Sequence, residues 1–594
     1  MQYPVYSEVT SCRDCYKCVR VCPVKAIQMK EGHAMIQHDR CIFCGRCVPV
    51  CPTHAKKVRD DVSRVKIAMS SGRKAICSLD STFSSEFAGR EKELLYALSV
   101  LGFDAVSETA IGAQLVSSAI DRYKERTGSC NWISTSCTSV VELIKKYHPE
   151  RVDDLAPVPS PLQTHAAYLR KLYGDDILIV AIGPCIARKH EADLYPGYPD
   201  YALTFTELKN WMRLSGINLD TIEVKKEVEF VPKKAGLSSL YSIEGGQIVS
   251  LATCGNPVLH PDAVALSGAE QIKSALRGKT DNDAFLELMG CDGSCINGPA
   301  TNRGISLADR KKRARQYISA RLEEGDLFEG DDGFVDEILE KGYGIIGAER
   351  PSRADSFHME HTEEEIRKAL EAIGKFSRKD ELNCGGCGYS TCREMAIAYL
   401  EGMADPEMCA TRMRKEAQSK VDMLLRTIPM GVVIVDNDLN IADCNIQFLK
   451  QFGEIDDTVL DEKMLSMVRS LPVERFVPFA AMFRRQFNLE SPGLYRMHYK
   501  DRFIRVRFFL VEKNRLLGAM FVDVTSPTVK RETVVRKAED VIQKSLETVQ
   551  QIASLLGENA AETEIMLNSL IDAFSVHSDE GGKAFSAEDD RDIT

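Results

Sequence analysis

The sequence predicts a multidomain protein that combines α/β and α+β domains. Its length of 594 residues corresponds to about four domains at ~150 residues per domain. Residues 65 to 350 alternate apolar, strand-like runs with helical runs, which is typical of an α/β domain. The twenty cysteines are clustered rather than scattered. In an intracellular chain of this length, such clusters favour metal sites over disulfides.

The composition excludes several classes of function. Asp and Glu outnumber Lys and Arg by 87 to 76, for a net charge of −11. This balance argues against a nucleic-acid partner, because phosphate binding draws on clustered basic residues. No apolar run approaches the ~20 residues that a membrane span needs, and no basic-then-apolar signal peptide opens the chain. We therefore expect a cytoplasmic protein with no membrane partner.

The first element is a repeated cysteine pattern in residues 1–60. Each copy reads C-x2-C-x2-C-x3-C and is followed by proline, Pro23 or Pro52. Three closely spaced thiolates can hold three irons of one cubane, while the fourth cysteine of each run serves the other cluster. The pattern resembles bacterial two-cluster ferredoxins and predicts electron transfer; a pair of zinc sites is the weaker alternative. The resemblance implies Cys12, Cys15, Cys18 and Cys51 for one 4Fe-4S cluster, and Cys41, Cys44, Cys47 and Cys22 for the other.

Three further cysteine motifs lie in the predicted α/β domain. They are STSCT around Cys137, GPCIARKHE around Cys185, and ELMGCDGSCINGP around Cys291 and Cys295. Each follows a strand-like or helical run, where loops usually carry chemistry. Thiolates are soft ligands that suit iron–sulfur clusters, and a catalytic metal also needs an open position in a dry cavity. Because residues i and i+4 can share one face of a helical turn, we expect Cys291 and Cys295 to do so.

These motifs resemble the three signature loops of iron-iron (FeFe) hydrogenases, T-S-C-C-P, M-P-C-x-x-K-x-x-E and E-x-M-x-C-x-x-x-C. The resemblance implies a 4Fe-4S cubane held by Cys137, Cys185, Cys291 and Cys295. Cys295 would bridge to a two-iron subsite that carries CO, cyanide and azadithiolate. The implied reaction is reversible H2 oxidation and proton reduction, with electrons passing through Cys295. The register rests on KKYHPE (145–150) for the first loop, Glu191 for the second, and Glu287 and Met289 for the third.

The loops also depart from the family pattern. Ser136 stands where the family has its proton-transfer cysteine, and serine is a far weaker acid than cysteine, whose pKa is ~8.5. Arg188 replaces the lysine that contacts a cyanide, with Lys189 adjacent; Gly183 replaces a methionine, and Thr138 a proline. Such neighbours tune a metal site without removing it. The stretch GAQLVSSAIDRY (112–123) also lacks the family's paired acidic residues, so we expect slow proton delivery and low turnover.

Other residues in this domain carry weaker signals. Cys77, Cys130, Cys254 and Cys444 fall outside the motifs, and a free cysteine is most often a small buried apolar residue. Cys254 is an alternative candidate for a proton donor. The Gly245–Gly246 pair permits close approach to a cofactor, although a plain turn explains it equally well.

A fourth cluster module follows. Thr362 and Glu365 form a capping-box pattern that predicts the start of a helix. The downstream spacing C-x2-C-x4-C-x16-C resembles a small 4Fe-4S domain of redox enzymes, with zinc as the alternative. Sixteen of the twenty cysteines then serve four 4Fe-4S clusters. The ligands implied for this cluster are Cys384, Cys387, Cys392 and Cys409.

The C-terminal part has no cysteine motif. Around residues 420–528, two strand-like runs flank an Asp-Asn-Asp turn, Asn445 precedes a helix, and two further strands end the segment. This resembles a PAS domain, a sensor and dimerisation fold. His498 is a conceivable haem ligand, but a lone histidine is usually structural or exposed. Lys530 to Phe574 fits a heptad with polar interruptions, which predicts a dimeric coiled coil or a helix packed on its own subunit.

Together these patterns predict a slow, ferredoxin-type FeFe hydrogenase that senses H2 or redox state. We expect a redox partner such as ferredoxin, hydrogenase maturation proteins, homodimerisation, and a separate signalling effector. The alternatives are an ordinary metabolic hydrogenase, or an iron–sulfur scaffold or carrier without the two-iron subsite. The implied catalytic residues are Cys295, Ser136, Arg188, Lys189, Glu191 and Met289, and the implied cofactor-contacting residues are Gly183, Gly245 and Gly246. The predicted domains are ferredoxin-like, 1–60; H-cluster, 61–350; small helical 4Fe-4S, 358–415; PAS, 420–528; coiled coil, 529–576; and a disordered acidic tail, 577–594.

Overall fold

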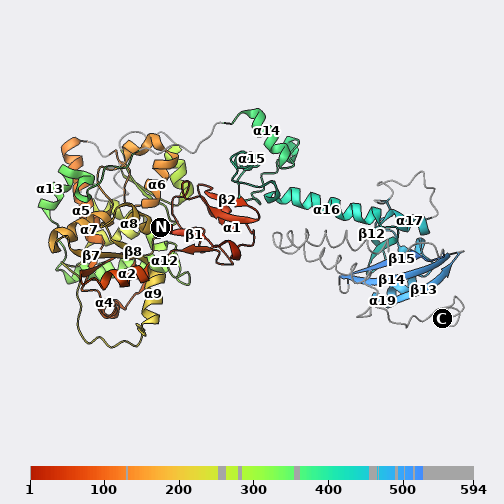
Figure 1. Ribbon diagram of the computed structural model, residues 1–594, viewed down its shortest axis with the longest axis horizontal. Helices are drawn as coiled ribbons and strands as arrows, with labels where there is room; N and C mark the ends of the chain where they lie inside the picture. Colours follow the sequence, from red (N-terminus) through yellow and green to blue (C-terminus); the bar gives the residue numbers. More distant parts are fainter. Residues whose placement is uncertain are drawn as a thin grey trace. The chain divides into compact units, whose positions relative to one another are not determined.

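The computed structural model describes residues 2–128, 131–251, 263–277, 284–352, 361–453, 465, 467–487, 493–500, 502–512 and 515–525. The chain forms two compact units (Figure 1). The first comprises Met1–Cys12, Tyr16–Ala369 and Leu382–Asp405, and the second comprises Arg13–Cys15, Leu370–Glu381 and Pro406–Thr594. The predicted coiled coil, the acidic tail, Cys130 and Cys254 lie outside the described residues.

The cysteine-rich N-terminal module is built from two short antiparallel strand pairs. Strand β1 (Val5–Ser7) pairs with β4 (Lys56–Val58), and β2 (Ile27–Lys30) pairs with β3 (His33–Ile36). The helix α1 (Lys17–Val21) contains Cys18, and Cys22 is its C-terminal cap residue. The strands therefore frame the cysteine loops, as expected of a small ferredoxin-like module.

The central domain is α/β, as its alternating pattern predicted. Its main sheet is parallel, in the order β6-β5-β7-β8. Strand β7 is buried almost throughout, as parallel sheets covered on both faces require. Leu178, Val180 and Ile182 pack on one face and Ile177 and Ile179 on the other. The strands are β5 (Lys74–Leu79), β6 (Ala105–Glu108), β7 (Ile177–Gly183) and β8 (Tyr201–Thr204).

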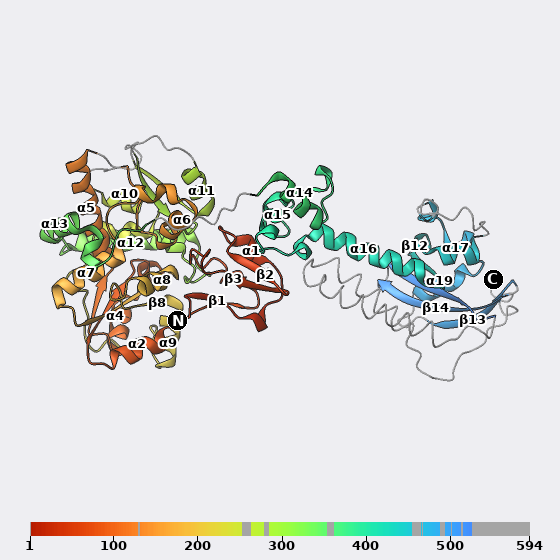
Figure 2. The same cartoon turned by 45° about the horizontal axis from the view of Figure 1, so that its top comes forward.

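Helices surround this sheet in both views (Figure 2). Residues of α2, α4 and α9 belong to the core on one face, and α7 packs on the other. A second parallel pair, β9 (Ala263–Ser267) with β10 (Phe285–Met289), supports the third cysteine motif. The longer helices are α2 (Val62–Met69), α4 (Glu91–Val100), α5 (Ala110–Thr127), α6 (Thr138–Tyr147), α7 (Pro161–Tyr173), α8 (Ala187–Leu194), α9 (Phe205–Leu214), α11 (Ala269–Arg277), α12 (Leu307–Glu324) and α13 (Asp332–Lys341).

Two helices mark the fourth cysteine module. Helix α14 (Glu363–Ala372) starts where the capping box predicted, since Thr362 Oγ1 donates to Glu365 and accepts from the Glu365 amide. Helix α15 (Cys392–Leu400) is capped by Thr391. Helix α16 (Ala410–Thr427) follows in the second unit.

The second unit contains a five-stranded antiparallel sheet in the order β12-β11-β15-β14-β13. Helices α17 (Ile446–Phe452) and α19 (Ala480–Phe487) lie against it (Figure 2). Asn445 caps α17, as its position before that helix predicted. Phe448, Phe452 and Phe521 pack in the core. The strands are β11 (Gly431–Asp436), β12 (Ile441–Cys444), β13 (Leu494–Tyr499), β14 (Arg502–Glu512) and β15 (Leu516–Asp523).

Among the described residues, no helix combines the length and the apolar character that crossing a membrane demands.

Candidate metal centre

Four cysteines converge at the ends of elements in the central domain. Cys137 caps α6, Cys185 follows β7, and Cys291 follows β10, while Cys295 opens the short 3₁₀ helix Cys295–Asn297. The amide of Gly290 donates to Cys137 Sγ at 3.4 Å. The thiols of Cys185, Cys291 and Cys295 all interact electrostatically with that of Cys137. The structure thus brings together the four residues that the motifs singled out.

The backbone between Cys291 and Cys295 differs from the expected helical turn. The amide of Ser294 donates to the Cys291 carbonyl at 3.0 Å, which closes a tight turn. Gly293 and Ser294 have φ values of +79° and +74°, in the left-handed region. At Gly293 a Cβ atom would lie 2.5 Å from the side chain of Leu307, so glycine suits both the conformation and the packing. The prediction of a shared helical face was therefore wrong, although both thiols reach the site.

The chemistry of this donor set fits a metal cluster. Burial raises the pKa of Cys185 to about 11, although Arg188 opposes the shift. Burial, together with neighbouring thiols, raises the pKa values of Cys291 and Cys295 well above the usual range. Four neighbouring, partly buried thiolates repel one another unless a cation is bound, and soft iron ions provide that charge. The residues therefore suit a 4Fe-4S cubane.

A small cavity of about 40 Å³ adjoins Cys295. The structure places four of the predicted catalytic residues on its wall: Cys295, Ser136, Arg188 and Met289. The Ser136 hydroxyl is buried, donates to Gln247 Oε1 at 3.2 Å, and lies 2.9 Å from Ser134 Oγ. The wall also includes residues that sequence motifs did not identify, among them Asp80, Thr109, Tyr241 and Ser242.

Arg188 is held in place by its neighbours. One guanidinium nitrogen donates to the Ser136 carbonyl at 2.9 Å, and the other donates to Glu191 and to Thr138 Oγ1, the latter at 3.2 Å. Burial lowers the pKa of Arg188, but the Glu191 carboxylate outweighs this and raises it overall. Glu191 is absent from the cavity wall and also accepts from Thr138 and Ser160. Glu191 therefore positions Arg188 and does not itself face the cavity.

Lys189 lies in a different environment from Arg188. Its ammonium group is fully buried and donates to Asp61 at 2.9 Å, to Glu207 at 2.8 Å and to the Ala202 carbonyl at 2.9 Å. Burial alone would raise the pKa of the Asp61 carboxyl. Lys189 and the nearby arginines outweigh this effect, so the pKa is lowered overall. Lys189 does not line the cavity beside Cys295. Of the two adjacent cations, only Arg188 reaches the candidate site.

The glycines implied as cofactor contacts act through the backbone. A Cβ on Gly183 would lie 2.7 Å from Asp80 Cβ, so this glycine lets the end of β7 approach Asp80. Gly245 has a φ of +80°, and a Cβ on Gly246 would collide with the Leu240 carbonyl. None of the three glycines lines the cavity.

The Gly245–Gly246 turn instead binds the carboxylate of Glu287. Amides of Gly245, Gln247 and Ile248, at the start of the short helix α10 (Gly246–Ser250), donate to it at 2.9, 3.1 and 3.1 Å. Burial raises the pKa of Glu287 to about 7, although these amides oppose the shift. The turn therefore fixes β10, which leads into Cys291 and Cys295.

A chain of hydroxyl groups runs from the cavity to α5. Tyr241, on the cavity wall, shares a 2.7 Å hydrogen bond with Ser117, which shares a 2.8 Å bond with Ser250. Ser117 belongs to the 112–123 stretch that lacks the family's paired acidic residues. Burial raises the pKa of Tyr241, so its phenol stays neutral. This series of hydroxyl groups could not be recognised from the sequence, because serine and tyrosine carry no diagnostic spacing.

The N-terminal cysteines approach the central site. Burial and neighbouring thiols raise the pKa values of Cys41 and Cys44 to about 12, and both interact with Cys22. Cys47 interacts with the same three thiols, which is the grouping that the ferredoxin resemblance implied for one cluster. Cys44 also interacts with Cys137 and Cys291. This set therefore adjoins the four cysteines of the central domain.

The remaining predicted ligands are placed individually. Within the first unit, backbone amides donate to Cys12 at 3.5 Å and to Cys51 at 3.2 Å, and Cys18 is buried. Cys15 and Cys409 belong to the second unit, where Cys409 is buried. In the fourth module, Cys384 is exposed, Cys387 is buried and Cys392 begins α15. Cys77 and Cys444 are buried, as expected of free cysteines.

Three family models match the parts of the chain that contain these cysteines. Residues 66–299 match the family model "Iron only hydrogenase large subunit, C-terminal domain". Residues 11–55 match the 4Fe-4S dicluster domain, and residues 380–410 match a model described as an Fe-S cluster.

Two curated relatives are hydrogenases. NADP-reducing hydrogenase subunit HndD of Solidesulfovibrio fructosivorans is 24% identical over 402 residues, which cover 57% of this chain and 64% of that protein. Iron hydrogenase 1 of Clostridium pasteurianum is 20% identical over 317 residues, which cover 43% of this chain and 55% of that protein. The chain thus spans less than two thirds of the length of either relative. Among solved structures, a variant of the FeFe-hydrogenase HydA1 from Chlamydomonas reinhardtii matches with 17% identity and a TM-score of 0.36, covering 48% of this chain and 96% of that one.

Proposed function

We propose that the protein is an FeFe hydrogenase of low turnover that senses H2 or redox state, because residues 66–299 match the iron-only hydrogenase family model and iron–sulfur models match on either side. The observation that carries the proposal is the convergence of Cys137, Cys185, Cys291 and Cys295 beside a cavity that Cys295 itself lines. One side of this site meets the ferredoxin-like cysteines. The other side meets hydroxyl groups.

The cysteine motifs are the basis for the cofactors that we propose. Cys137, Cys185, Cys291 and Cys295 would hold the cubane, and Cys295 would also contact a two-iron subsite with CO, cyanide and azadithiolate in the adjoining cavity. When bound, that subsite supplies the chemistry of heterolytic H2 cleavage. Arg188 offers a fixed positive charge and hydrogen-bond donors at the cavity wall, while Met289 adds apolar surface that limits water. Twelve further cysteines of the motifs would hold three more 4Fe-4S clusters.

The residues around the cavity explain a low turnover. Ser136 occupies the position where the family has a cysteine, and its hydroxyl releases a proton far less readily than a thiol with a pKa of ~8.5. Protons would have to move by exchange along neutral groups, namely Ser136 with Gln247, and Tyr241 with Ser117. Among the described residues, Asp80 is the one carboxylate on the cavity wall, and it accepts from Thr82 rather than from any of these four side chains. Slow proton delivery suits a sensor better than a metabolic catalyst.

The sensing role rests on the C-terminal unit. Its five-stranded antiparallel sheet, with α17 and α19 against it, supports the PAS-like interpretation of residues 420–528. We propose that this domain passes the redox state to a separate effector, since the sequence contains no recognisable output motif. Dimerisation would use the PAS-like domain and the predicted coiled coil, and maturation proteins would insert the two-iron subsite.

An iron–sulfur scaffold or carrier without the two-iron subsite is the second candidate. It is favoured by the departures at Ser136, Gly183 and Arg188, and by the small cavity of about 40 Å³. An ordinary metabolic hydrogenase would require a turnover typical of fast catalysts.

Infrared spectroscopy of the anaerobically matured protein tests the proposal. Under argon we expect bands of metal-bound CO and cyanide, and these bands should shift under H2. Absence of the bands from protein that carries its cubanes would refute the hydrogenase assignment and favour the scaffold or carrier.

A further inference from the structure

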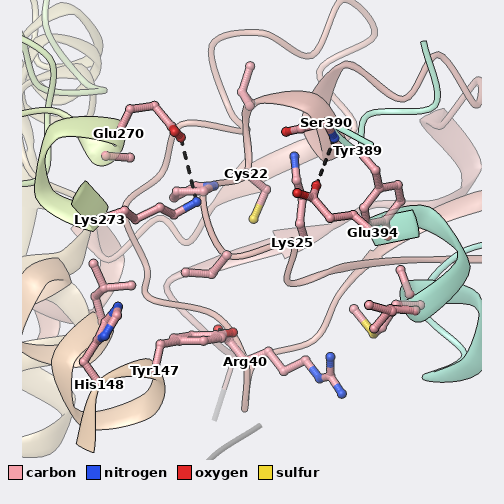
Figure 3. A pocket seen from close by; sticks show the side chains of 18 of the residues that line it. Cys22, Lys25, Arg40, Tyr147, His148, Glu270, Lys273, Tyr389, Ser390 and Glu394 are labelled. Atoms are coloured by element: carbon pink, nitrogen blue, oxygen red, sulfur yellow. Dashed lines mark hydrogen bonds and ion pairs between the residues drawn. The ribbon is translucent and has the colours of Figure 1, made fainter. Parts of the chain in front are cut away.

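A wide groove in the first unit exposes one of the predicted cluster ligands. It has a volume of about 1210 Å³ and is bordered by the ferredoxin-like module, by α11 and by the fourth cysteine module. Figure 3 shows Cys22 and Lys25 on its wall, with Tyr389 and Glu394 from the fourth module nearby. Lys273, from α11, lines the same groove and pairs with Glu270 at 3.8 Å. Two predicted cluster modules therefore meet at one wall.

The contacts between these modules gather around Cys387. The guanidinium of Arg20 donates to the Gly386 carbonyl at 2.9 Å, and Lys25 Nζ donates to the Gly388 carbonyl at 2.6 Å. Gly388 has a φ of +94°, and a Cβ there would lie 3.0 Å from Val19. The residues on both sides of Cys387 are thus fixed to the segment that ends at Cys22. Glycine at 388 permits this close approach.

Lys25 has an unusual set of partners. Its ammonium group donates to the carbonyls of Val19 at 3.1 Å, Arg20 at 3.3 Å and Gly388 at 2.6 Å. Within the described ranges, no carboxylate lies within 4 Å of it, and the nearby charged groups are Lys273 and Glu394. Its remaining electrostatic neighbours are the thiols of Cys22 and Cys387. A partly buried charge calls for an opposite charge, and Cys22 provides the strongest such interaction, ahead of Glu394 and Cys387.

We propose that Lys25 is a tuning residue that couples the cluster of Cys22, Cys41, Cys44 and Cys47 to the cluster of the fourth module. Its positive charge stabilises the reduced, more negative form of both clusters. If both clusters are bound, one electron would leave the first cluster as the fourth-module cluster gains it, and no proton or further reactant would be needed. Electrons from the central site would thus reach the fourth module through Cys44 and Cys22. The proposal rests on the proposed function only in requiring that these clusters be redox-active.

A purely structural role for Lys25 predicts a different effect of its replacement. The carbonyls of Val19 and Arg20 belong to the end of α1, where a cation also stabilises the helix dipole. If Lys25 acted only in this way, its replacement would alter stability and leave the cluster potentials unchanged. Reduction potentials therefore separate the two roles.

The test uses full-length protein with reconstituted clusters and potentiometric titration followed by EPR. In Lys25→Met, we expect both clusters to become harder to reduce, by up to tenfold in the reduction equilibrium, or about 59 mV for a one-electron couple. Lys25→Arg keeps the charge and should remain near the wild type. Lys273→Met removes a charge from the same groove without touching the fourth module, and should shift the potentials less. Unchanged potentials in Lys25→Met, or an equal fall in Lys25→Arg, would overturn the proposal.

A second measurement covers the case in which Lys25→Met loses a cluster. In fully reduced wild-type protein, magnetic interaction between neighbouring clusters should split the EPR signal of the Cys22 cluster. Cys384→Ser, which removes a ligand of the fourth module, should abolish this splitting. If the splitting persists in a Cys384→Ser protein shown to lack that cluster, the coupling is refuted. Neither readout depends on CO or cyanide bands, so failure of the hydrogenase assignment would be seen separately.

Discussion

The two sides of the central site are built from different chemistry. On the electron side, Cys44 lies in electrostatic reach of Cys137 and Cys291, and Arg46 donates to the Gly290 carbonyl at 2.9 Å. On the proton side, the cavity wall offers hydroxyl groups of serine, threonine and tyrosine, together with Arg188 and with Asp80, whose carboxylate accepts from Thr82. Thiolate ligands pass electrons readily, whereas neutral hydroxyls release protons poorly. We therefore expect proton delivery, rather than electron transfer, to limit H2 turnover.

We expect the largest effect on H2 turnover from replacing Cys295, which is predicted to contact both the cubane and the two-iron subsite. Cys295→Ala deletes one cubane ligand and the predicted contact to the two-iron subsite. We expect H2 turnover to fall by roughly 100-fold or more, since removing even a residue that only hydrogen-bonds to a metal ligand costs about 10–100-fold. Activity and iron content should both be measured, with Cys77→Ala as a control because Cys77 is buried away from the motifs. Turnover that survives Cys295→Ala would remove this residue from the site.

Substitutions of the adjacent residues Arg188 and Lys189 test which side chains belong to the site. Lys189→Met leaves Asp61 and Glu207 without their buried partner and should lower the free energy of unfolding by about 3 kcal/mol. Chemical denaturation would measure this loss. The infrared bands should not move, because Lys189 does not line the cavity.

Arg188→Met provides the matched comparison. Arg188 lines the cavity, so this change should shift the cyanide bands. Bands that respond to Lys189→Met and not to Arg188→Met would reverse the assignment.

Ser136→Cys should make proton delivery to the site faster. A thiol at this position can donate and accept a proton near neutral pH, and positioned acid–base groups contribute about 10²–10⁴-fold to catalysis. We expect H2 evolution to rise at least about tenfold, a smaller gain than a fully positioned acid–base group gives. Ser134→Cys, 2.9 Å away but absent from the cavity wall, is the control. No gain in a fully loaded Ser136→Cys protein would show that this position does not limit turnover.

The smallest effect is expected along the hydroxyl chain. Tyr241→Phe removes the hydrogen bond to Ser117 while keeping the ring in place. H2 turnover should fall several-fold, and the cluster potentials should stay constant. A loss of similar size in Ser250→Ala would indicate that protons leave this series of hydroxyl groups through Ser250. Unchanged turnover in both variants would exclude these hydroxyl groups as a proton path.

Sequence patterns identified the thiols but not the shape around them. Cysteine spacing is a local property, so the ferredoxin-like runs could be recognised without coordinates, whereas grouping Cys137, Cys185 and Cys295 in one cluster rested on the resemblance of their motifs to a known family. Helix starts at Thr362 and Asn445 were also readable, because a capping side chain acts on its own helix.

Long-range geometry explains what the sequence did not reveal. Arg188 and Lys189 are neighbours in sequence, yet only packing sends one to the cavity and the other to Asp61 and Glu207. The left-handed turn before Cys295 arises from Gly293 packed against Leu307. Tyr241 reaches the cavity from a segment without any metal-binding pattern.

The most direct test of the central claim compares H2 turnover in H2O and in D2O. If proton delivery limits the reaction, the wild type should be markedly slower in D2O, and Ser136→Cys should reduce this isotope effect. The same rate in both solvents for the wild type would contradict the account and place the limit on electron transfer.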